Sequence, residues 1–317
     1  GAFLAALALA DLWRIHWPAM LFSDWSSLQA SAPPAEIGAS PAAVFHYQRA
    51  DHGLRPWNPK FALGEDLRAF ERGVWADLGG NVALAYGIRF VAEASGIRRR
   101  RAAALYRELE RLPIDGAVRL LRSLGVGFLI GEVALTSPGL ERLREGGSGR
   151  AWIYRLEGAA PRTYLASRLR PVADASSAFR ELAAPAFRPG EEAMVEGDCP
   201  PSLDCGNASS VGSSAPGSAS ITRDEPERIE IDASLVHPAL LVIGDSWDAD
   251  WVAEVDGRRA PIVPANGIVR GVPLGAGEHR VVLRYAPRSF RLGLVISFAG
   301  IALAVIVALT AILRLMN

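Results

Sequence analysis

A cluster of carboxylates and indoles is the part of this sequence best suited to chemistry. Trp247, Asp248, Asp250 and Trp251 fall within five consecutive positions. A sugar ring stacks its apolar C–H face on an aromatic ring, while carboxylates accept hydrogen bonds from its hydroxyl groups. The sequence therefore predicts a substrate-binding site for sugars that is made of these four residues.

Two other interpretations of the same stretch stay open. Asp245, Asp248 and Asp250 offer the oxygen ligands that a hard cation such as Ca²⁺ prefers, although the glycine and terminal glutamate of an EF-hand are absent. Alternatively, Trp251 fills a β-sandwich core, Asp256 shapes a hairpin and the remaining acids are solvated. We predict no metal ligand.

The motifs of this chain do not indicate an enzyme that breaks bonds. There is no Gly-x-Ser-x-Gly motif and no His-Glu-x-x-His motif, and the five histidines are scattered. The 34 basic and 34 acidic residues balance, so no global field attracts nucleic acid. We therefore predict no catalytic residue, no cofactor and no nucleic-acid partner.

The two cysteines, Cys199 and Cys205, lie in a low-complexity stretch, residues 197–220, that we predict to be a long surface loop. Metal sites usually need four ligands, and no histidine lies nearby. A local disulfide, which requires an oxidising compartment, is therefore favoured over a metal site. Two free thiols on a loop are the alternative.

Alternating apolar residues predict β-structure in the second half of the chain. The dipeptides Asp256-Gly257 and Asn266-Gly267 are hairpin signals between such stretches. We predict an α+β protein with a mixed α/β lobe over residues 13–160. An antiparallel, jelly-roll-like β-sandwich is predicted to follow over 161–288.

A membrane helix is predicted over residues 289–314. Its centre, Leu292 to Leu313, is a run of 22 residues without charge, and about 20 suffice to cross a bilayer. Residues 1–12 are predicted to be the end of another membrane helix, with an ordinary buried helix as the alternative. The arginines before the last helix favour a cytoplasmic domain and the cysteine pair favours the opposite side, so charge alone leaves the sidedness open.

Four consecutive arginines, Arg98 to Arg101, open a predicted helix that continues to Leu112. Such a run is either a solvated helix face or a contact for anionic lipid headgroups. We favour the solvated helix face, with contact to anionic headgroups as the alternative.

Several elements resemble the carboxy-terminal signature of YfhO-type bacterial membrane proteins in order and spacing. They are the strand and Trp-ended turn from Leu241 to Trp251, Val255-Asp-Gly257, Arg270-Gly-Val272, Gly275 to His279 and Tyr285 to Phe290. The family usually has a Pro-Gly before the turn's tryptophan, where this chain has Ala249-Asp250. Looser similarity reaches back to about residue 120, for example at Pro161 to Tyr164.

The resemblance implies a setting for this chain. YfhO-like proteins are similar to polytopic C-type glycosyltransferases, which use polyprenyl-phosphate sugars on the outer face of the cytoplasmic (inner) membrane of bacteria. Their catalytic acids lie in a many-helix part, so none can be carried over to this chain. The expected partners are membrane lipid and a lipid-linked sugar or cell-envelope glycan.

We therefore expect an extracytoplasmic, non-catalytic part of a YfhO-like protein that acts in cell-envelope glycan modification. The alternative is a membrane-tethered carbohydrate-binding surface protein without enzymatic activity. Whether the complete protein transfers sugars is left open by the sequence.

Overall fold

The chain contains two compact units, which are described separately below. The computed structural model describes residues 35–38, 40, 42–49, 54–56, 88–89, 99–131, 133–145, 151–203, 205 and 216–316. The first unit comprises Gly1–Ala160 with Ala183–Pro185, and the second comprises Pro161–Leu182 with Ala186–Asn317. The membrane-helix end predicted for residues 1–12 lies outside the described residues.

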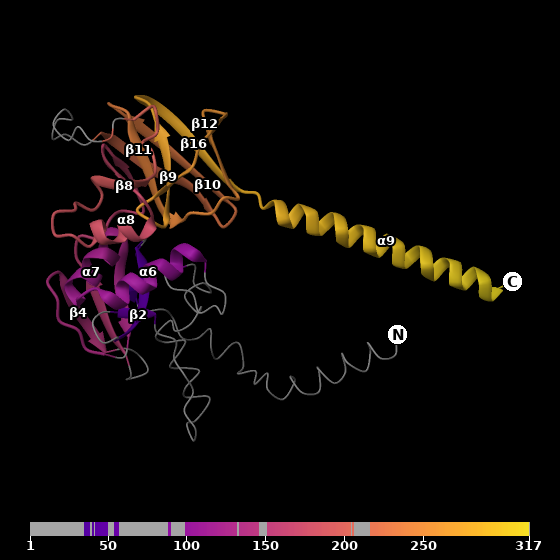
Figure 1. Cartoon of the computed structure of the whole chain (residues 1–317), viewed down its shortest axis with the longest axis horizontal. Helices are drawn as coiled ribbons and strands as arrows, with labels where there is room; N and C mark the ends of the chain where they lie inside the picture. The colour runs from indigo at the N-terminus through magenta and orange to yellow at the C-terminus, as the bar shows by residue number, and fades with distance from the viewer. Residues whose placement is uncertain are drawn as a thin grey trace, which may run out of the picture. The chain divides into compact units, whose positions relative to one another are not determined.

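The first unit contains a five-stranded mixed sheet (Figure 1, indigo to magenta). Its strand order is β2 (Leu54–Pro56), β1 (Ala43–Arg49), β3 (Val126–Gly131), β5 (Trp152–Leu156) and β4 (Leu140–Glu145). The β1–β3 pair is parallel, and the other pairs of described strands in this sheet are antiparallel. Every residue of β3 is buried, as expected for a central strand.

Three helices are described in the first unit: α3 (Ala35–Gly38), α6 (Arg100–Arg111) and α7 (Ile114–Ser123). The apolar residues Leu105 and Leu109, one turn apart, are buried on α6, which packs against β2 and α7. The amino-terminal cap of α7 is Pro113, and Asp115 in its first turn accepts a hydrogen bond from Ser137 Oγ (2.7 Å).

The second unit is a β-sandwich of two sheets followed by a long helix (Figure 1, red to yellow). The strands are β6 (Thr163–Ala166), β7 (Arg168–Val172), β8 (Glu192–Glu196), β9 (Gly217–Glu225), β10 (Arg228–Leu235), β11 (Ala239–Ser246), β12 (Trp251–Val255), β13 (Arg258–Ala260), β14 (Val263–Ala265), β15 (Val269–Leu274) and β16 (Gly277–Tyr285). One sheet has the order β13-β12-β16-β10-β9, and the other has the order β6-β11-β15-β14-β8-β7. The sandwich also carries the short helix α8 (Ala175–Leu182).

The predicted fold class is confirmed, with one departure from a fully antiparallel sandwich. The β7–β8 pair is parallel because α8 lies between these strands in the chain and returns it in the same direction. The core lies between the two sheets, since Ile231 and Leu283 of one sheet pack in the same buried cluster as Leu241 and Val272 of the other.

Both predicted Asx-Gly hairpins are present. Asp256 and Gly257 have φ values of 52° and 76°, and Asn266 and Gly267 have 47° and 74°. Two consecutive left-handed residues are typical of the type I′ turn, which matches the twist of an antiparallel pair. The turns connect β12 to β13 and β14 to β15.

The low-complexity stretch differs in part from the predicted loop of residues 197–220. Cys199 and Cys205 form a disulfide in the structure, and Cys205 makes an isolated parallel bridge with Leu169 of β7. Strand β9 already begins at Gly217, inside the stretch predicted to be a loop. The sequence does not indicate the start of this strand, because it begins with glycine and serine and the inward-facing residue before Ile221 is only an alanine.

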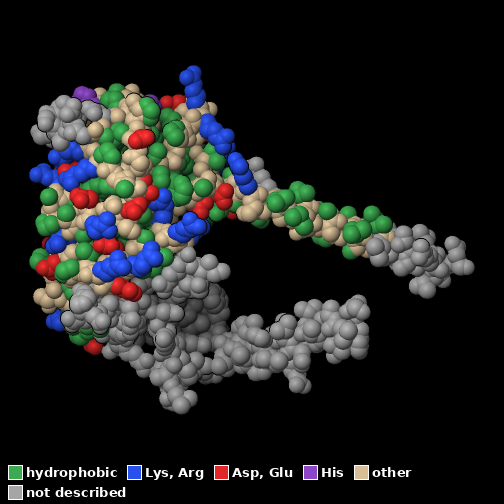
Figure 2. All heavy atoms as spheres, viewed as in Figure 1, with side chains coloured by type: hydrophobic (Ala, Val, Ile, Leu, Met, Phe, Trp, Pro, Cys, Tyr) green, Lys and Arg blue, Asp and Glu red, His purple; other side chains and the backbone are tan. Residues whose placement is uncertain are grey.

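The last helix, α9, spans Arg288–Met316. Among the described residues it is the one helix that is long and apolar enough to cross a membrane. Figure 2 shows hydrophobic side chains along its described part, where Val295 and Phe298, for example, are 66% and 67% exposed. Exposed apolar residues on all sides favour contact with lipid over contact with water.

Candidate functional site

The four predicted sugar-contact residues lie in the tight turn that joins β11 to β12. The Trp247 N–H donates to the Ile268 carbonyl (2.7 Å), and the Trp251 N–H donates to the Asp248 carbonyl (3.2 Å). The Asp250 N–H donates to the Asp248 side chain (2.9 Å). This side-chain-capped turn explains how the chain reverses here without the Pro-Gly pair that the family usually has.

Neighbouring side chains contact the indole of Trp251. It packs against the sandwich core and lies 5.4 Å, centroid to centroid, from the ring of Tyr285. The guanidinium of Arg270 lies 3.7 Å from its centroid. Trp251 is thus held as a structural support of the turn, although it is half-buried, as are Trp247, Asp248 and Asp250.

Arg270 and Tyr285 belong to this site, although the sequence analysis did not select them as site residues. Arg270 is only 4% exposed and donates from Nε to the Ser246 carbonyl (3.1 Å). An arginine in the otherwise apolar strand β15 is the signal that could have found it, because a buried charge requires dedicated partners.

Asp245 and Asp256 are engaged away from the turn. Arg162 donates to both Asp224 and Asp245, at 2.8 Å and 3.2 Å from Nη2. The Asp256 carboxylate bonds the ring of His279 (2.7 Å) and the Arg280 N–H (2.8 Å), which lowers its pKa. Among the residues that the structure describes, no group of three or more potential ligands could hold a metal ion.

A hydrogen bond connects the turn to the segment just before α9. The Ala286 N–H donates to the Asp250 carbonyl (2.9 Å), and the Tyr285 N–H donates to the Glu227 carbonyl (2.9 Å). Only Pro287 then separates Ala286 from Arg288, the first residue of α9. The candidate site therefore lies next to the start of the apolar helix α9.

Residues 237–297 match the family model described as bacterial membrane protein YfhO.

The match confirms the YfhO resemblance over the segment that contains the turn. The YfhO segment runs from just before β11 through β16 and into α9. It includes the Asp250–Ala286 hydrogen bond, and it indicates a membrane-associated role for the chain. The comparisons with curated proteins and with solved structures found no match.

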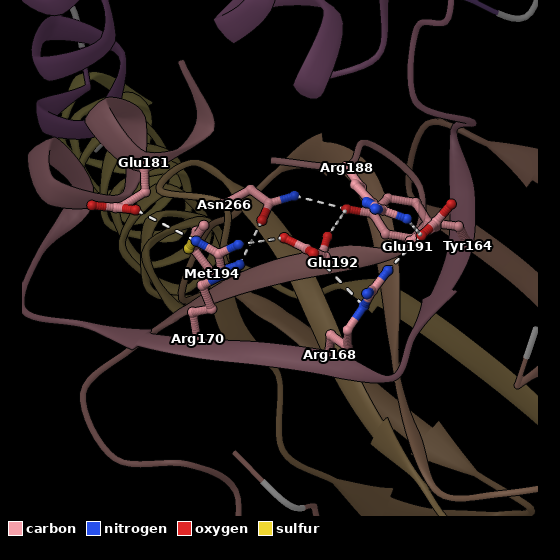
Figure 3. Close-up of polar contacts among 9 residues, drawn as sticks. All are labelled: Tyr164, Arg168, Arg170, Glu181, Arg188, Glu191, Glu192, Met194 and Asn266. Carbon is pink, nitrogen blue, oxygen red and sulfur yellow. Dashed lines mark hydrogen bonds and ion pairs between the residues drawn. The ribbon is translucent and has the colours of Figure 1, made fainter. Parts of the chain in front are cut away.

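A second polar cluster lies in the six-stranded sheet of the second unit (Figure 3), which is called the YfhO-like unit below because it contains the matching residues 237–297. The Asn266 side chain donates to Tyr164 Oη (2.9 Å) and accepts from the Met194 N–H (2.9 Å). Glu192 is 5% exposed and accepts from Arg170 Nη2 (2.9 Å), with Arg168 Nε at 3.6 Å. The polar groups of this cluster bond to one another. The cluster therefore fixes β8 between β7 and β14 and is not a second reactive site.

Proposed function

We propose that the YfhO-like unit is an extracytoplasmic, non-catalytic part of a polytopic membrane protein related to polyprenyl-phosphate-sugar-dependent glycosyltransferases. It acts in cell-envelope glycan modification. Its role is to hold the sugar of a lipid-linked donor or an envelope glycan at the turn between β11 and β12.

The observation that carries this proposal is the hydrogen bond from Ala286 to Asp250. From Ala286 to Arg288 the chain spans at most about 7 Å, because two residues extend it no further. With α9 in a bilayer, the turn lies close to the lipid headgroups. A sugar attached to a membrane lipid is presented at that level, whereas a free glycan is not confined there.

The contacts of the turn assign different roles to its residues. Trp247 stacks on the sugar ring, and Asp248 and Asp250 accept hydrogen bonds from its hydroxyl groups. Trp251 supports the turn from the core side, since Arg270 and Tyr285 cover it. The unit binds and positions sugar without breaking bonds.

The proposed location is the outer face of the cytoplasmic membrane. The Cys199–Cys205 disulfide supports it, because disulfides persist in oxidising compartments. Arg284, before α9, and Arg288, the first residue of α9, favour the opposite orientation. We give the disulfide more weight because the positive-inside bias is set over all spans of a polytopic protein.

The test is binding of a short-chain polyprenyl-phosphate hexose by the full chain in nanodiscs. Trp247→Ala is expected to weaken binding about tenfold, the loss of one aromatic stacking contact. Trp152→Ala is the matched control, because Trp152 is half-buried like Trp247 but lies in the first unit. Equal binding by both variants would contradict the assigned site.

A second arm separates the two candidate functions. The lipid-free hexose and an envelope oligosaccharide are compared with the lipid-linked probe under the same conditions. Tighter binding of the lipid-linked sugar supports the transferase-related role. Equal or tighter binding of the lipid-free oligosaccharide supports a membrane-tethered carbohydrate-binding protein.

A further inference from the structure

Helix α6 of the first unit carries a row of arginines that the proposed function does not use. Arg100, Arg107 and Arg111 are exposed, while Leu105 and Leu109 are buried. At 100° per residue these three arginines fall within about 40° of the helix circumference, along about 16 Å of its length. They form one straight basic row, which we call the α6 arginine row.

Within the described part of the chain, no acidic side chain pairs with the row. No ion pair or hydrogen bond joins the side chain of Arg100, Arg107 or Arg111 to another residue in the described part of the chain. The acidic residue exposed on this helix is Glu110, at the flank of the row. Elsewhere on the described surface, exposed arginines such as Arg155 and Arg223 are paired with glutamates.

The stability of the helix does not account for this arrangement. The first turn of α6 contains no acidic residue, and Arg100 and Arg101 stand where the helix dipole favours negative charge. Arginines in this place weaken an isolated helix. Their guanidinium groups instead suit bidentate hydrogen bonding to phosphate.

We propose that the α6 arginine row docks on the anionic phospholipid headgroups of the bilayer that holds the chain. For a membrane-associated chain, the bilayer surface is a polyanion that is always near. The row has no aromatic or large apolar side chain among its arginines, which suits contact with headgroups and not insertion or base stacking. The α6 packing against β2 fixes which face is presented.

Energy transfer from a fluorophore on α6 to a headgroup acceptor tests the proposal. The full chain is labelled through Ala103→Cys, which removes no charge, while the native cysteines stay disulfide-bonded. Nanodiscs of phosphatidylcholine alone are compared with nanodiscs that also contain phosphatidylglycerol. Transfer is expected to rise with the anionic fraction and to fall in 0.5 M salt, because salt screens surface charge.

Two variants and a control identify the residues responsible. Arg100→Gln, Arg107→Gln and Arg111→Gln together are expected to weaken docking about a hundredfold, and Arg107→Gln alone about fivefold. The control removes the same charge from Arg188, Arg258 and Arg259, which are exposed in the second unit, and is expected to leave docking unchanged. Circular dichroism checks that each variant is folded.

Three results overturn the proposal. The first is energy transfer that does not depend on phosphatidylglycerol. The second is transfer that persists in the triple variant of the row, and the third is transfer that is lost equally in the control variant. The first two mean that α6 faces solvent or another protein, and the third means that net charge acts without the row.

Discussion

The guanidinium of Arg270 lies over the ring of Trp251, 3.7 Å from its centroid. Arg270 also donates from Nε to the carbonyl of Ser246, the last residue of β11. One side chain of β15 thus holds both ends of the turn between β11 and β12. A cation–π contact that is largely removed from water contributes about 1–2 kcal/mol.

Truncating Trp251 is expected to destabilise the second unit far more than truncating Trp247. Trp251→Ala removes contacts with the core, Tyr285 and Arg270, and should lower the free energy of unfolding by about 3 kcal/mol. Trp247→Ala should lower it by less than about 1 kcal/mol. Urea unfolding of the full chain in detergent, followed by circular dichroism, gives both values, and equal losses would contradict the assigned roles.

Replacing Arg162 is expected to loosen the link between the two sheets. Arg162 joins Asp224 of β9 to Asp245 of β11, and the Arg162 and Asp245 side chains are 15% and 16% exposed. Arg162→Met should cost about 2 kcal/mol, because it removes the charged hydrogen bond from Arg162 to a mostly buried carboxylate. Asp245→Asn in the same chain should recover part of that loss.

The exposed pair Arg155–Glu141 supplies the control for Arg162. Arg155→Met should cost less than about 1 kcal/mol, as is usual for exposed ion pairs. A double-mutant cycle in urea measures the coupling between Arg162 and Asp245. An additive result would show that the ion pair does not stabilise the sandwich.

Two glycines with the same backbone conformation are expected to differ in their tolerance of alanine. Gly257 and Gly267 have φ values of 76° and 74°, so alanine costs about 1–2 kcal/mol of backbone strain at either. A Cβ at Gly267 would lie 2.6 Å from the buried ring of Phe179, whereas nothing lies within 4 Å at Gly257. Gly267→Ala should therefore cost about 2 kcal/mol more than Gly257→Ala, by thermal or urea unfolding.

The stability contributed by Glu230 is expected to depend on pH. Hydrogen bonds from Arg280 and Arg228 lower the pKa of Glu230 from 4.5 to about 2. A lowered folded-state pKa adds stability above the unfolded-state value, and this stability is lost as the pH falls through the folded-state value. Glu230→Gln should thus be destabilised relative to the natural protein at pH 6, progressively less below pH 4.5, and not at all below pH 2.

Glu254→Gln controls for a general effect of charge. The Glu254 carboxylate lies 3.7 Å from Arg284, which is beyond hydrogen-bonding distance. Its urea midpoint should follow that of the natural protein across the same pH range. A pH-independent gap for Glu230→Gln would show that the lost carboxylate acts through packing.

The sequence predicted those features of the sandwich that depend on local chemistry. Asp256-Gly257 and Asn266-Gly267 make their turns because both positions of each pair tolerate left-handed backbone. The start of α9 was predicted at residue 289 from the uncharged apolar run alone, and the helix begins one residue earlier, at Arg288. None of these features needs knowledge of distant residues.

Features that depend on distant contacts were not predictable in the same way. Strand β9 begins at Gly217 because it pairs with β10, and its own serines and alanine give no strand signal. The contacts of Trp251 with Arg270 and Tyr285 join three strands. The sequence showed that aromatic and acidic residues were close together, but the sheet pairing determines which indole is covered.

The disulfide has a consequence for how separate copies of the chain behave. Strand β7 is the last strand of its sheet, and Cys205, held by Cys199, makes a bridge to Leu169 at that strand. An open strand edge is a template on which another copy can add a strand. A reducing environment would remove this cover, so oligomers should accumulate at concentrations where the oxidised protein stays monodisperse.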